Sequence, residues 1–176
     1  MLLGISGALR QGSTNTLLIR EAGRHWGGDF EEADIRFPLY DNDLEDQEGL
    51  PDVVQAVVDQ IARADAVVVA TPEYNQSFSG VLKNALDWIS RSKDKPWVDK
   101  PVALMSAAAG RAGGARANYA LRLAMTPFRP RLLPQDVLIA GARAEFDAQG
   151  RLTSERYDAQ VTDIVAALRA EVARGR

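Results

Sequence analysis

The sequence predicts an α/β domain built on a doubly wound parallel sheet of five strands, with helices on both faces. Short apolar runs alternate with amphipathic stretches along the whole 176-residue chain, which is the pattern that parallel strands joined by crossover helices produce. The run at 64–70 ends in Ala-Val-Val-Val-Ala, as in a strand buried on both faces. No repeat or linker divides the chain, so we expect residues 1–176 to form one domain.

The chain begins with the alternation of a strand and a helix. Residues 2–6 form a short apolar run, read as the first strand, and residues 14–26 carry a mixed apolar face that predicts a helix ended by Gly27-Gly28. Residues 31–37 alternate loosely, which indicates a less buried edge strand. A loop is expected at 38–43.

The same alternation continues to the end of the chain. Pro51 opens a helix whose valines recur at helical spacing, and the β-branched run at 64–70 is the clearest strand. Apolar periodicity and glycine or proline breaks place the remaining elements. These are a helix at 78–91, a strand at 101–106, a loop at 107–114, a helix at 115–125, a fifth strand within 131–139 assigned to 136–139, a turn at 144–151 and a helix from about 154 to 173.

The loop at 6–16 has the composition of a phosphate-binding loop. It reads Ser-Gly-Ala-Leu-Arg-Gln-Gly-Ser-Thr-Asn-Thr and joins a strand to a helix. Backbone N–H groups and the positive end of the helix dipole therefore point at one spot. Polar side chains add further donors, and these come from Ser6, Arg10, Ser13, Thr14, Asn15 and Thr16.

Two standard phosphate loops do not fit this segment. The dinucleotide fingerprint G-x-G-x-x-G is absent, and Ser13 stands where G-x4-G-K-[ST] has the lysine that reaches the outer phosphates of a nucleoside triphosphate. The loop suits a single terminal phosphate held mainly by neutral donors, as in flavin mononucleotide. The alternative is an ordinary helix cap on a surface loop.

Composition excludes several classes of site. The chain has no cysteine and one histidine, His25, so disulfides, thiolate nucleophiles and cysteine-based metal sites are ruled out, and a catalytic triad lacks its parts. We expect no metal and no catalytic side chain, with a bound cofactor carrying the chemistry. The net charge of −3 predicts no nucleic-acid partner. No membrane span or secretory signal is recognised, so a cytoplasmic location is expected.

Two further loops are expected beside the first. In a doubly wound sheet, ligands bind at the carboxyl ends of the strands near the switch point, where the loops after strands one, three and four converge. The segment 71–80 offers its main chain and the ring of Tyr74 to a planar heterocycle, although a simple turn before a helix is the alternative. The segment 106–114 lacks large side chains other than Arg111, so its backbone can lie against a ligand. Arg111 and Arg116 are candidates for pyridine-nucleotide phosphates, or else solvated surface charges.

Five short motifs carry a resemblance to a known family. They are Gly4-Ile5-Ser6-Gly7-Ala8-Leu9-Arg10-Gln11-Gly12-Ser13-Thr14-Asn15, Thr71-Pro72-Glu73-Tyr74-Asn75-Gln76-Ser77, Leu82-Lys83-Asn84-Ala85-Leu86-Asp87-Trp88, Pro38-Leu39-Tyr40 and Phe146-Asp147-x-x-Gly150-x-Leu152. Together they resemble the NADPH-dependent FMN reductase family, a flavodoxin-like branch that includes bacterial chromate and quinone reductases. The resemblance covers nearly the whole chain. It implies a sheet in the order 2-1-3-4-5, bound FMN, oxidation of NADPH or NADH, and a homodimer or homotetramer with the flavin near a subunit interface.

The resemblance also implies roles for individual residues. Those at the flavin are the phosphate ligands Ser6, Arg10, Ser13 and Asn15 with Thr14 and Thr16 beside them, the isoalloxazine loop Pro72, Glu73, Tyr74, Asn75 and Ser77, and Ser106, Gly110 and Gly113 of the third loop. The helix at 78–91 and the loop at 39–48 are suggested to build a two-fold contact, with packing of Trp88 inside one subunit as the alternative. Two departures from the family pattern are Phe78-Ser79-Gly80, where a proline usually precedes the glycine, and the three alanines after Ser106.

The activity implied is a two-step, ping-pong hydride transfer. NAD(P)H gives hydride to flavin N5 and leaves, and a quinone, chromate, azo compound or free flavin then takes the electrons from the same open face. The rival from another class is a flavodoxin-like electron carrier that binds FMN without oxidising NAD(P)H, although such carriers are usually more acidic than −3. A phosphoacceptor receiver domain needs clustered aspartates after the first strand, where this chain has Ser6-Gly7.

Overall fold

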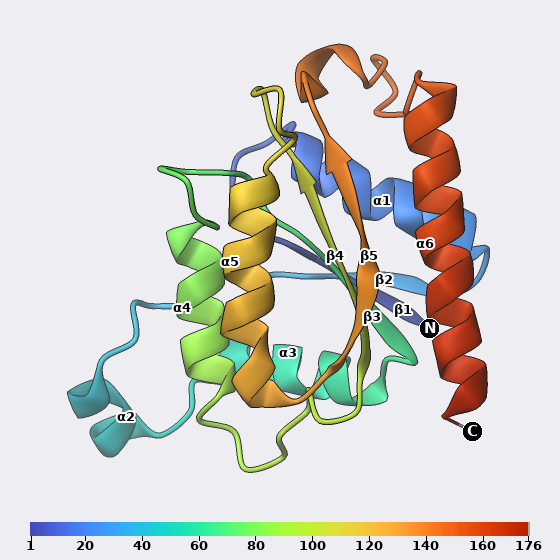
Figure 1. Ribbon diagram of the computed structural model, residues 1–176. Coiled ribbons are helices and arrows are strands. Elements are labelled where there is room, and N and C mark those ends of the chain that lie inside the picture. Colours follow the sequence, from blue (N-terminus) through green and yellow to red (C-terminus); the bar gives the residue numbers. More distant parts are fainter. Residues whose placement is uncertain (176) are drawn as a thin grey trace.

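Five parallel strands form one sheet in the order β2-β1-β3-β4-β5 (Figure 1). The computed structural model describes residues 1–175, and every neighbouring pair of strands in it is parallel. The predicted sheet class and strand order are therefore confirmed. The strands are β1 (Leu2–Ser6), β2 (Phe30–Ala33), β3 (Ala66–Ala70), β4 (Pro101–Ala107) and β5 (Arg131–Ile139).

Helices cover both faces of the sheet. The helices are α1 (Thr14–Trp26), α2 (Asn42–Glu48), α3 (Asp52–Arg63), α4 (Gly80–Ile89), α5 (Ala115–Met125) and α6 (Glu155–Arg174), with short 3-10 turns at Thr126–Phe128 and Ala142–Ala144. Helices α1 and α6 pack on one face, and α3, α4 and α5 pack on the other (Figure 1). No helix within residues 1–175 is long and apolar enough to cross a membrane.

Strand β3 shows why the sequence forms two cores. Its five residues are all buried, and alternate side chains point to opposite faces of a strand. Val68 packs in the core under α1 and α6, whereas Val67 and Val69 pack in the core under α3 and α4. Each such valine contributes roughly 1.5–3 kcal/mol when it leaves water, so a β-branched strand stabilises both layers at once.

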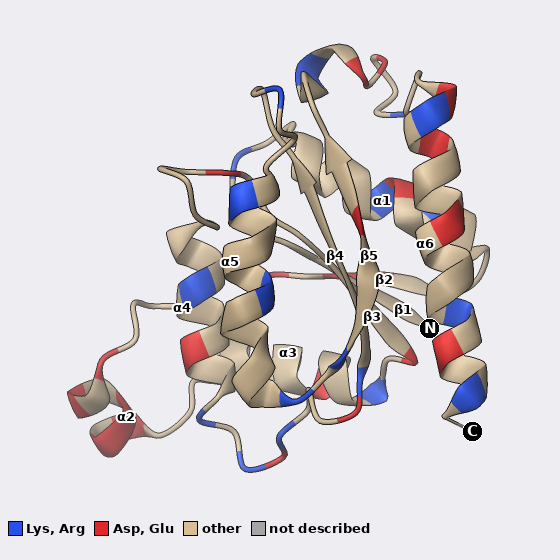
Figure 2. Ribbon diagram, viewed as in Figure 1, with Lys and Arg blue, Asp and Glu red and all other residues tan. Residues whose placement is uncertain are grey.

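Helix α2 lies inside the segment that the sequence predicts as a loop. Asp41 caps its first turn by accepting from the backbone N–H of Asp43 at 2.9 Å. None of its residues is buried, and Figure 2 shows that this helix is rich in acidic residues and lies at the periphery of the molecule. An apolar stripe is therefore absent, and hydrophobic periodicity gives no sign of the helix.

Three other element boundaries also differ from the prediction. Strand β2 ends at Ala33 instead of continuing to 37, because the Asp34 carboxylate accepts from the backbone N–H of Arg36 at 3.1 Å and turns the chain. Strand β5 begins at Arg131, earlier than 136, since its pairing with β4 includes the half-buried residues at its start. Helix α4 spans only Gly80–Ile89, because the side chain of Ser79 caps its first turn.

Candidate functional site

A pocket of about 240 Å³ opens where the carboxyl ends of β1, β3 and β4 meet. We call it the edge pocket. The first loop (residues 7–13) and the start of α1 contribute Ala8, Arg10, Ser13, Thr14 and Asn15, the second loop (71–79) contributes Pro72, Glu73 and Tyr74, and the end of β4 with the third loop (108–114) contributes Ala107, Ala108 and Ala109. The predicted convergence of three loops is therefore present in the structure.

The amino end of α1 gives the edge pocket its polarity. Ser13 is the N-cap, and its hydroxyl accepts from the backbone N–H of Asn15 at 3.2 Å. No acidic residue lies in the first turn of α1, so nothing in this helix competes for the unpaired N–H groups and the positive end of its dipole. Thr14 and Arg10 line the same pocket. This arrangement suits an anion such as a phosphate.

Asn15, an expected phosphate ligand, lines the edge pocket and is also bonded to the main chain behind it. Both polar atoms of its buried amide bond the main chain of Ala107: the Nδ2 donates to the carbonyl and the Oδ1 accepts from the N–H, each at 2.9 Å. The side chain therefore ties the first loop to the end of β4. Only one amide hydrogen remains beyond these bonds, so its main contribution is to hold the pocket wall in place.

Ser6 and Thr16 lie on the other side of the first loop. Their hydroxyls bond each other at 2.8 Å, and both line a second pocket of about 450 Å³ beside β2. Arg20 and Arg36 at this pocket are paired with Glu32 and Asp34. Arg10 lines this larger pocket as well as the edge pocket and has no carboxylate partner among the described residues. The structure does not bring Ser6 and Thr16 into the edge pocket.

Ser106 is also turned away from the edge pocket. It is fully buried, and its hydroxyl donates to the carbonyl of Thr71 at 2.6 Å, which ties β4 to the second loop. A Cβ at Gly114, which has a φ of +86°, would overlap that hydroxyl. The Ser106 hydroxyl satisfies a buried carbonyl, and its ligand role stays a prediction.

The glycines of the third loop do not line the edge pocket either. Gly113 sits against the backbone of Leu138, where a Cβ would come within 2.7 Å of the carbonyl carbon. Gly110 is exposed, and its carbonyl accepts from the N–H of Gly113 at 3.1 Å. The two glycines shape the loop that carries the three lining alanines.

The second loop folds into a tight turn at its tip. Tyr74 and Ser77 exchange backbone hydrogen bonds of 2.9 and 3.0 Å, with Asn75 at a φ of 49° and Gln76 at 66° between them. This left-handed pair is a conformation that costs energy for residues other than glycine. Tyr74 remains half exposed and lines the edge pocket, whereas Asn75 and Ser77 do not line it.

Glu73 adds an unpaired acceptor beside the pocket. Its Oε1 lies 3.4 Å from the guanidinium of Arg116. Its Oε2 is buried and has no hydrogen-bond partner among the described residues. An orphaned buried oxygen is costly unless a ligand or water pairs with it. A flavin presents ring N–H groups and a phosphate, so an open acceptor, a flat alanine wall and a helix N-terminus fit FMN at the edge pocket.

A fourth segment that the sequence reasoning missed completes the pocket. Ala142 and Arg143 line it, from the 3-10 turn that follows β5. The alternation of strands and helices could have indicated this segment, because β5 is parallel to β4 and its carboxyl end therefore lies at the same edge of the sheet. The backbone N–H of Ala142 donates to the carbonyl of Ala108 at 3.1 Å, so this turn is attached to the third loop.

Two of the family-like motifs hold the fold together and do not reach the pocket. Asn84 accepts from the backbone N–H of Tyr40 at 2.8 Å and donates to the carbonyl of Pro38 at 2.9 Å. The indole N–H of Trp88 donates to the same carbonyl at 2.9 Å, and its ring meets Tyr40 edge-on with 5.0 Å between centroids. Trp88 is fully buried, so packing inside one subunit is confirmed for this residue.

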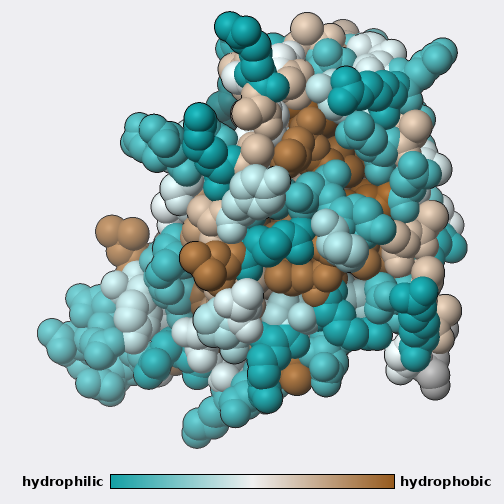
Figure 3. Space-filling view, viewed as in Figure 1, coloured by the Kyte–Doolittle hydropathy of each residue, from teal (hydrophilic) through white to brown (hydrophobic). Residues whose placement is uncertain are grey.

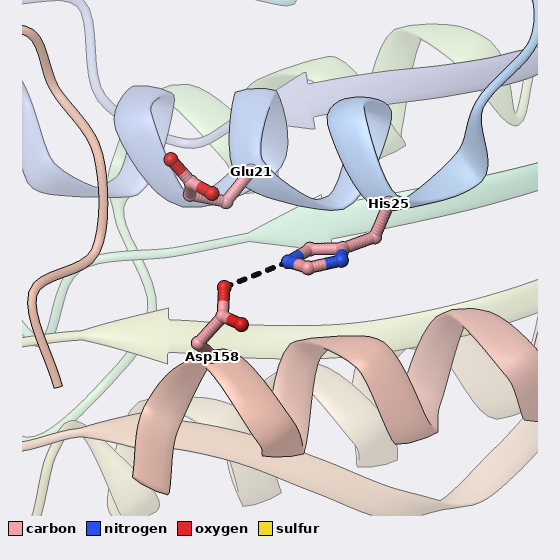
Figure 4. A group of neighbouring side chains, drawn as sticks. All are labelled: Glu21, His25 and Asp158. Atoms are coloured by element: carbon pink, nitrogen blue, oxygen red, sulfur yellow. Dashed lines mark hydrogen bonds and ion pairs between the residues drawn. The ribbon is translucent and has the colours of Figure 1, made fainter. Parts of the chain in front are cut away.

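A polar cluster of Glu21, His25 and Asp158 lies between α1 and α6 (Figure 4). The Nε2 of His25 is 2.8 Å from Asp158. Glu21 is buried, and its Oε1 pairs with Arg24 and also accepts from Arg151 at 3.0 Å. Two guanidiniums thus pair with Glu21, and the contact between His25 and Asp158 joins the two helices.

Comparison with known proteins agrees with this geometry. The family model for NADPH-dependent FMN reductase matches residues 1–144. An NAD(P)H-dependent FMN reductase of Pseudomonas aeruginosa is 44% identical over 180 residues, which cover 99% of this chain and 96% of that protein. A quinone reductase of Escherichia coli K12 is 45% identical over 122 residues, 66% of this chain and 64% of the relative. Among solved structures, the flavoenzyme NAD(P)H:(acceptor) oxidoreductase FerB from Paracoccus denitrificans is similar with a TM-score of 0.86 and 28% identity, over 98% of this chain and 97% of that one.

Proposed function

The chain belongs to the NADPH-dependent FMN reductase family and is an FMN-dependent oxidoreductase, and we propose that it oxidises NADPH or NADH and reduces a quinone by a ping-pong mechanism. The observation that carries the proposal is the edge pocket, where three loops and the N-terminus of α1 converge. Chromate, azo compounds and free flavin are further acceptors that the same open site would admit. FMN, when bound, supplies the hydride chemistry.

The chain's own residues position the cofactor. The N-terminus of α1, Thr14 and Arg10 bind the phosphate, and the alanines 107–109 let the backbone approach the flat ring. Asn15 and Ser106 fix the loops from behind through their bonds to Ala107 and Thr71. The loops are thus ordered before ligand binds, which lowers the entropic cost of holding a cofactor in one pose.

No side chain in the edge pocket is required as an acid or base. Glu73 is its carboxylate, and one oxygen of this group already faces Arg116. Tyr74 offers a ring face and lies at the exposed turn. The chain therefore supplies shape and electrostatics, and the flavin, when bound, would supply the redox chemistry.

Steady-state kinetics test the proposal. If NADPH and the quinone use the same open site in turn, double-reciprocal plots against NADPH at several quinone concentrations give parallel lines. Intersecting lines would mean a ternary complex and a second binding pocket. The carrier alternative gives negligible NADPH oxidation without a separate reductase, although the purified protein is yellow in both cases.

We also propose a cytoplasmic homodimer or homotetramer. Leu39 is 83% exposed, and Tyr119 and Leu123 on α5 are 62% and 73% exposed. Figure 3 shows apolar surface on the face that α5 and β5 present. Trp88 cannot serve this contact because it is buried in its own chain. Light scattering at micromolar concentration tests the assembly, since a monomer has a mass of 19.2 kDa.

A further inference from the structure

The turn after β5 places one cation at the edge pocket. Gly141 has a φ of 59° and starts the 3-10 turn Ala142–Ala144. Two backbone hydrogen bonds attach this turn and the third loop to each other: Ala108 donates to Ile139 at 3.0 Å and Ala142 donates to Ala108 at 3.1 Å. The backbone at Arg143 is therefore fixed beside the pocket, although its side chain lies at the surface.

The side chain of Arg143 is poised for a ligand. It lines the edge pocket together with Arg10. Within the described chain, no ion pair or side-chain hydrogen bond involves its guanidinium. Arg10 makes one contact of 3.3 Å, to the carbonyl of Gly12 in its own loop. By contrast, Arg116 faces Glu73 and Arg151 faces Glu21, so these two guanidiniums already have protein partners.

The charge of the expected ligand calls for more than one cation. A phosphate monoester carries about −1.5 to −2 at neutral pH, whereas the N-terminus of α1 supplies only about half a positive charge. Arg10 adds one charge, so a phosphate at the upper end of that range keeps roughly half a negative charge unbalanced. Glu73, the one carboxylate among the described lining residues, is engaged by Arg116. A second guanidinium at the same pocket covers that remaining charge.

We propose that Arg143 is a second guanidinium ligand of the FMN phosphate, supplied by the turn after β5 in addition to the first loop. This inference rests on the proposed function, since it takes FMN as the occupant of the edge pocket. Its consequence is specificity. Because riboflavin lacks the phosphate, Arg143 would favour FMN over riboflavin without touching the ring.

Binding of the two flavins to flavin-free, full-length protein tests the proposal. Quenching of flavin fluorescence gives the Kd for FMN and for riboflavin in the natural protein and in Arg143→Ala, Arg143→Lys and Lys93→Ala. Lys93 is a matched control, because it is exposed and lies in the α4–β4 connection at the opposite edge of the sheet. A charged hydrogen bond predicts that Arg143→Ala raises the Kd for FMN about ten- to a hundredfold. We expect Arg143→Lys to retain part of the affinity, and the Kd for riboflavin to stay within about twofold in every variant.

Four results separate the possible failures. Equal weakening of FMN and riboflavin in Arg143→Ala would mean a general disturbance of the pocket, and an unchanged Kd for FMN would mean no phosphate contact; either result overturns the inference. If Arg143→Ala raises only the KM for NADPH, the arginine serves the co-substrate and the inference is again wrong. If the natural protein itself binds no FMN, the proposed function fails. Should Arg143→Ala not fold, Arg143→Gln replaces it. A shallower dependence of FMN affinity on salt in Arg143→Gln than in the natural protein would support the phosphate contact, and an equal dependence would overturn it.

Discussion

Replacing Asn15 with alanine distinguishes a structural role from a ligand role at the edge pocket. The change removes two hydrogen bonds of 2.9 Å to Ala107, a residue that is 3% exposed. Water cannot easily reach the orphaned carbonyl and N–H. Each unsatisfied buried group costs about 1–3 kcal/mol, so we expect flavin-free protein to lose about 2–5 kcal/mol. That is a large share of the roughly 5–15 kcal/mol by which domains are stable.

Urea unfolding of the flavin-free protein, followed by tryptophan fluorescence, measures this loss. With a slope of about 2 kcal/mol per molar urea, the middle of the usual range, the midpoint falls by roughly 1–2.5 M at an unchanged slope. Thr14→Ala is the matched control, because Thr14 is adjacent and lines the same pocket; we expect its effect on the free energy of unfolding to stay within about 0.5 kcal/mol. An unchanged midpoint in Asn15→Ala, with only FMN affinity reduced, would refute the structural role and restore the ligand role.

Three further predictions follow from the same structure. Arg10→Ala weakens FMN binding by roughly 1.5–3 kcal/mol, the range of a charged hydrogen bond, and a fluorescence titration that shows no change would exclude this contact. Gly114→Ala destabilises far more than Gly49→Ala in thermal unfolding, because both have positive φ but only Gly114 lacks space for a Cβ; equal effects would contradict the packing at Ser106. The pKa of the Glu45 carboxyl lies below its ordinary value because Arg91 and then Tyr40 donate to it. The stabilisation that ionised Glu45 gives to α2 is therefore present above the unfolded pKa of about 4.3 and is lost as pH falls through the lower folded value. We expect the amides of α2 to lose protection from hydrogen exchange in acid. Constant protection between roughly pH 6 and pH 3 would count against this.

The sheet could be predicted because the residue types of its strands depend directly on whether one or both faces are buried. The run at 66–70 is β-branched since both faces are buried, and glycine or proline marks most ends. Helix α2 could not be predicted in this way, because none of its residues is fully buried and it is fixed by contacts such as Glu45 to Arg91 at 2.9 Å. That pairing joins residues 46 positions apart, so no local window contains it.

The site was predicted at the level of loops and less well at the level of side chains. Asn15 and Ser106 carry the polar groups that a phosphate loop needs, yet both turn inward to satisfy main-chain groups of Ala107 and Thr71. A sequence shows which side chains can donate hydrogen bonds but not where each of them points. That direction depends on which buried backbone groups would otherwise lack a hydrogen-bond partner. Arg143 was missed because the loop after β5 was not counted among those at the carboxyl edge.

The hydrogen bonds behind the pocket also determine where this enzyme can change. The loops are held to one another by hydrogen bonds of Asn15, Ser106 and Ala108. A substitution that breaks one of these bonds would therefore disturb more than one loop of the edge pocket. The tip at Asn75 and Gln76 is exposed and is closed off by the two bonds between Tyr74 and Ser77. New side chains or inserted residues at this tip would alter what stands above the cofactor and leave the frame intact. Because both residues have positive φ, glycine and asparagine are the substitutions that this turn accepts with least strain.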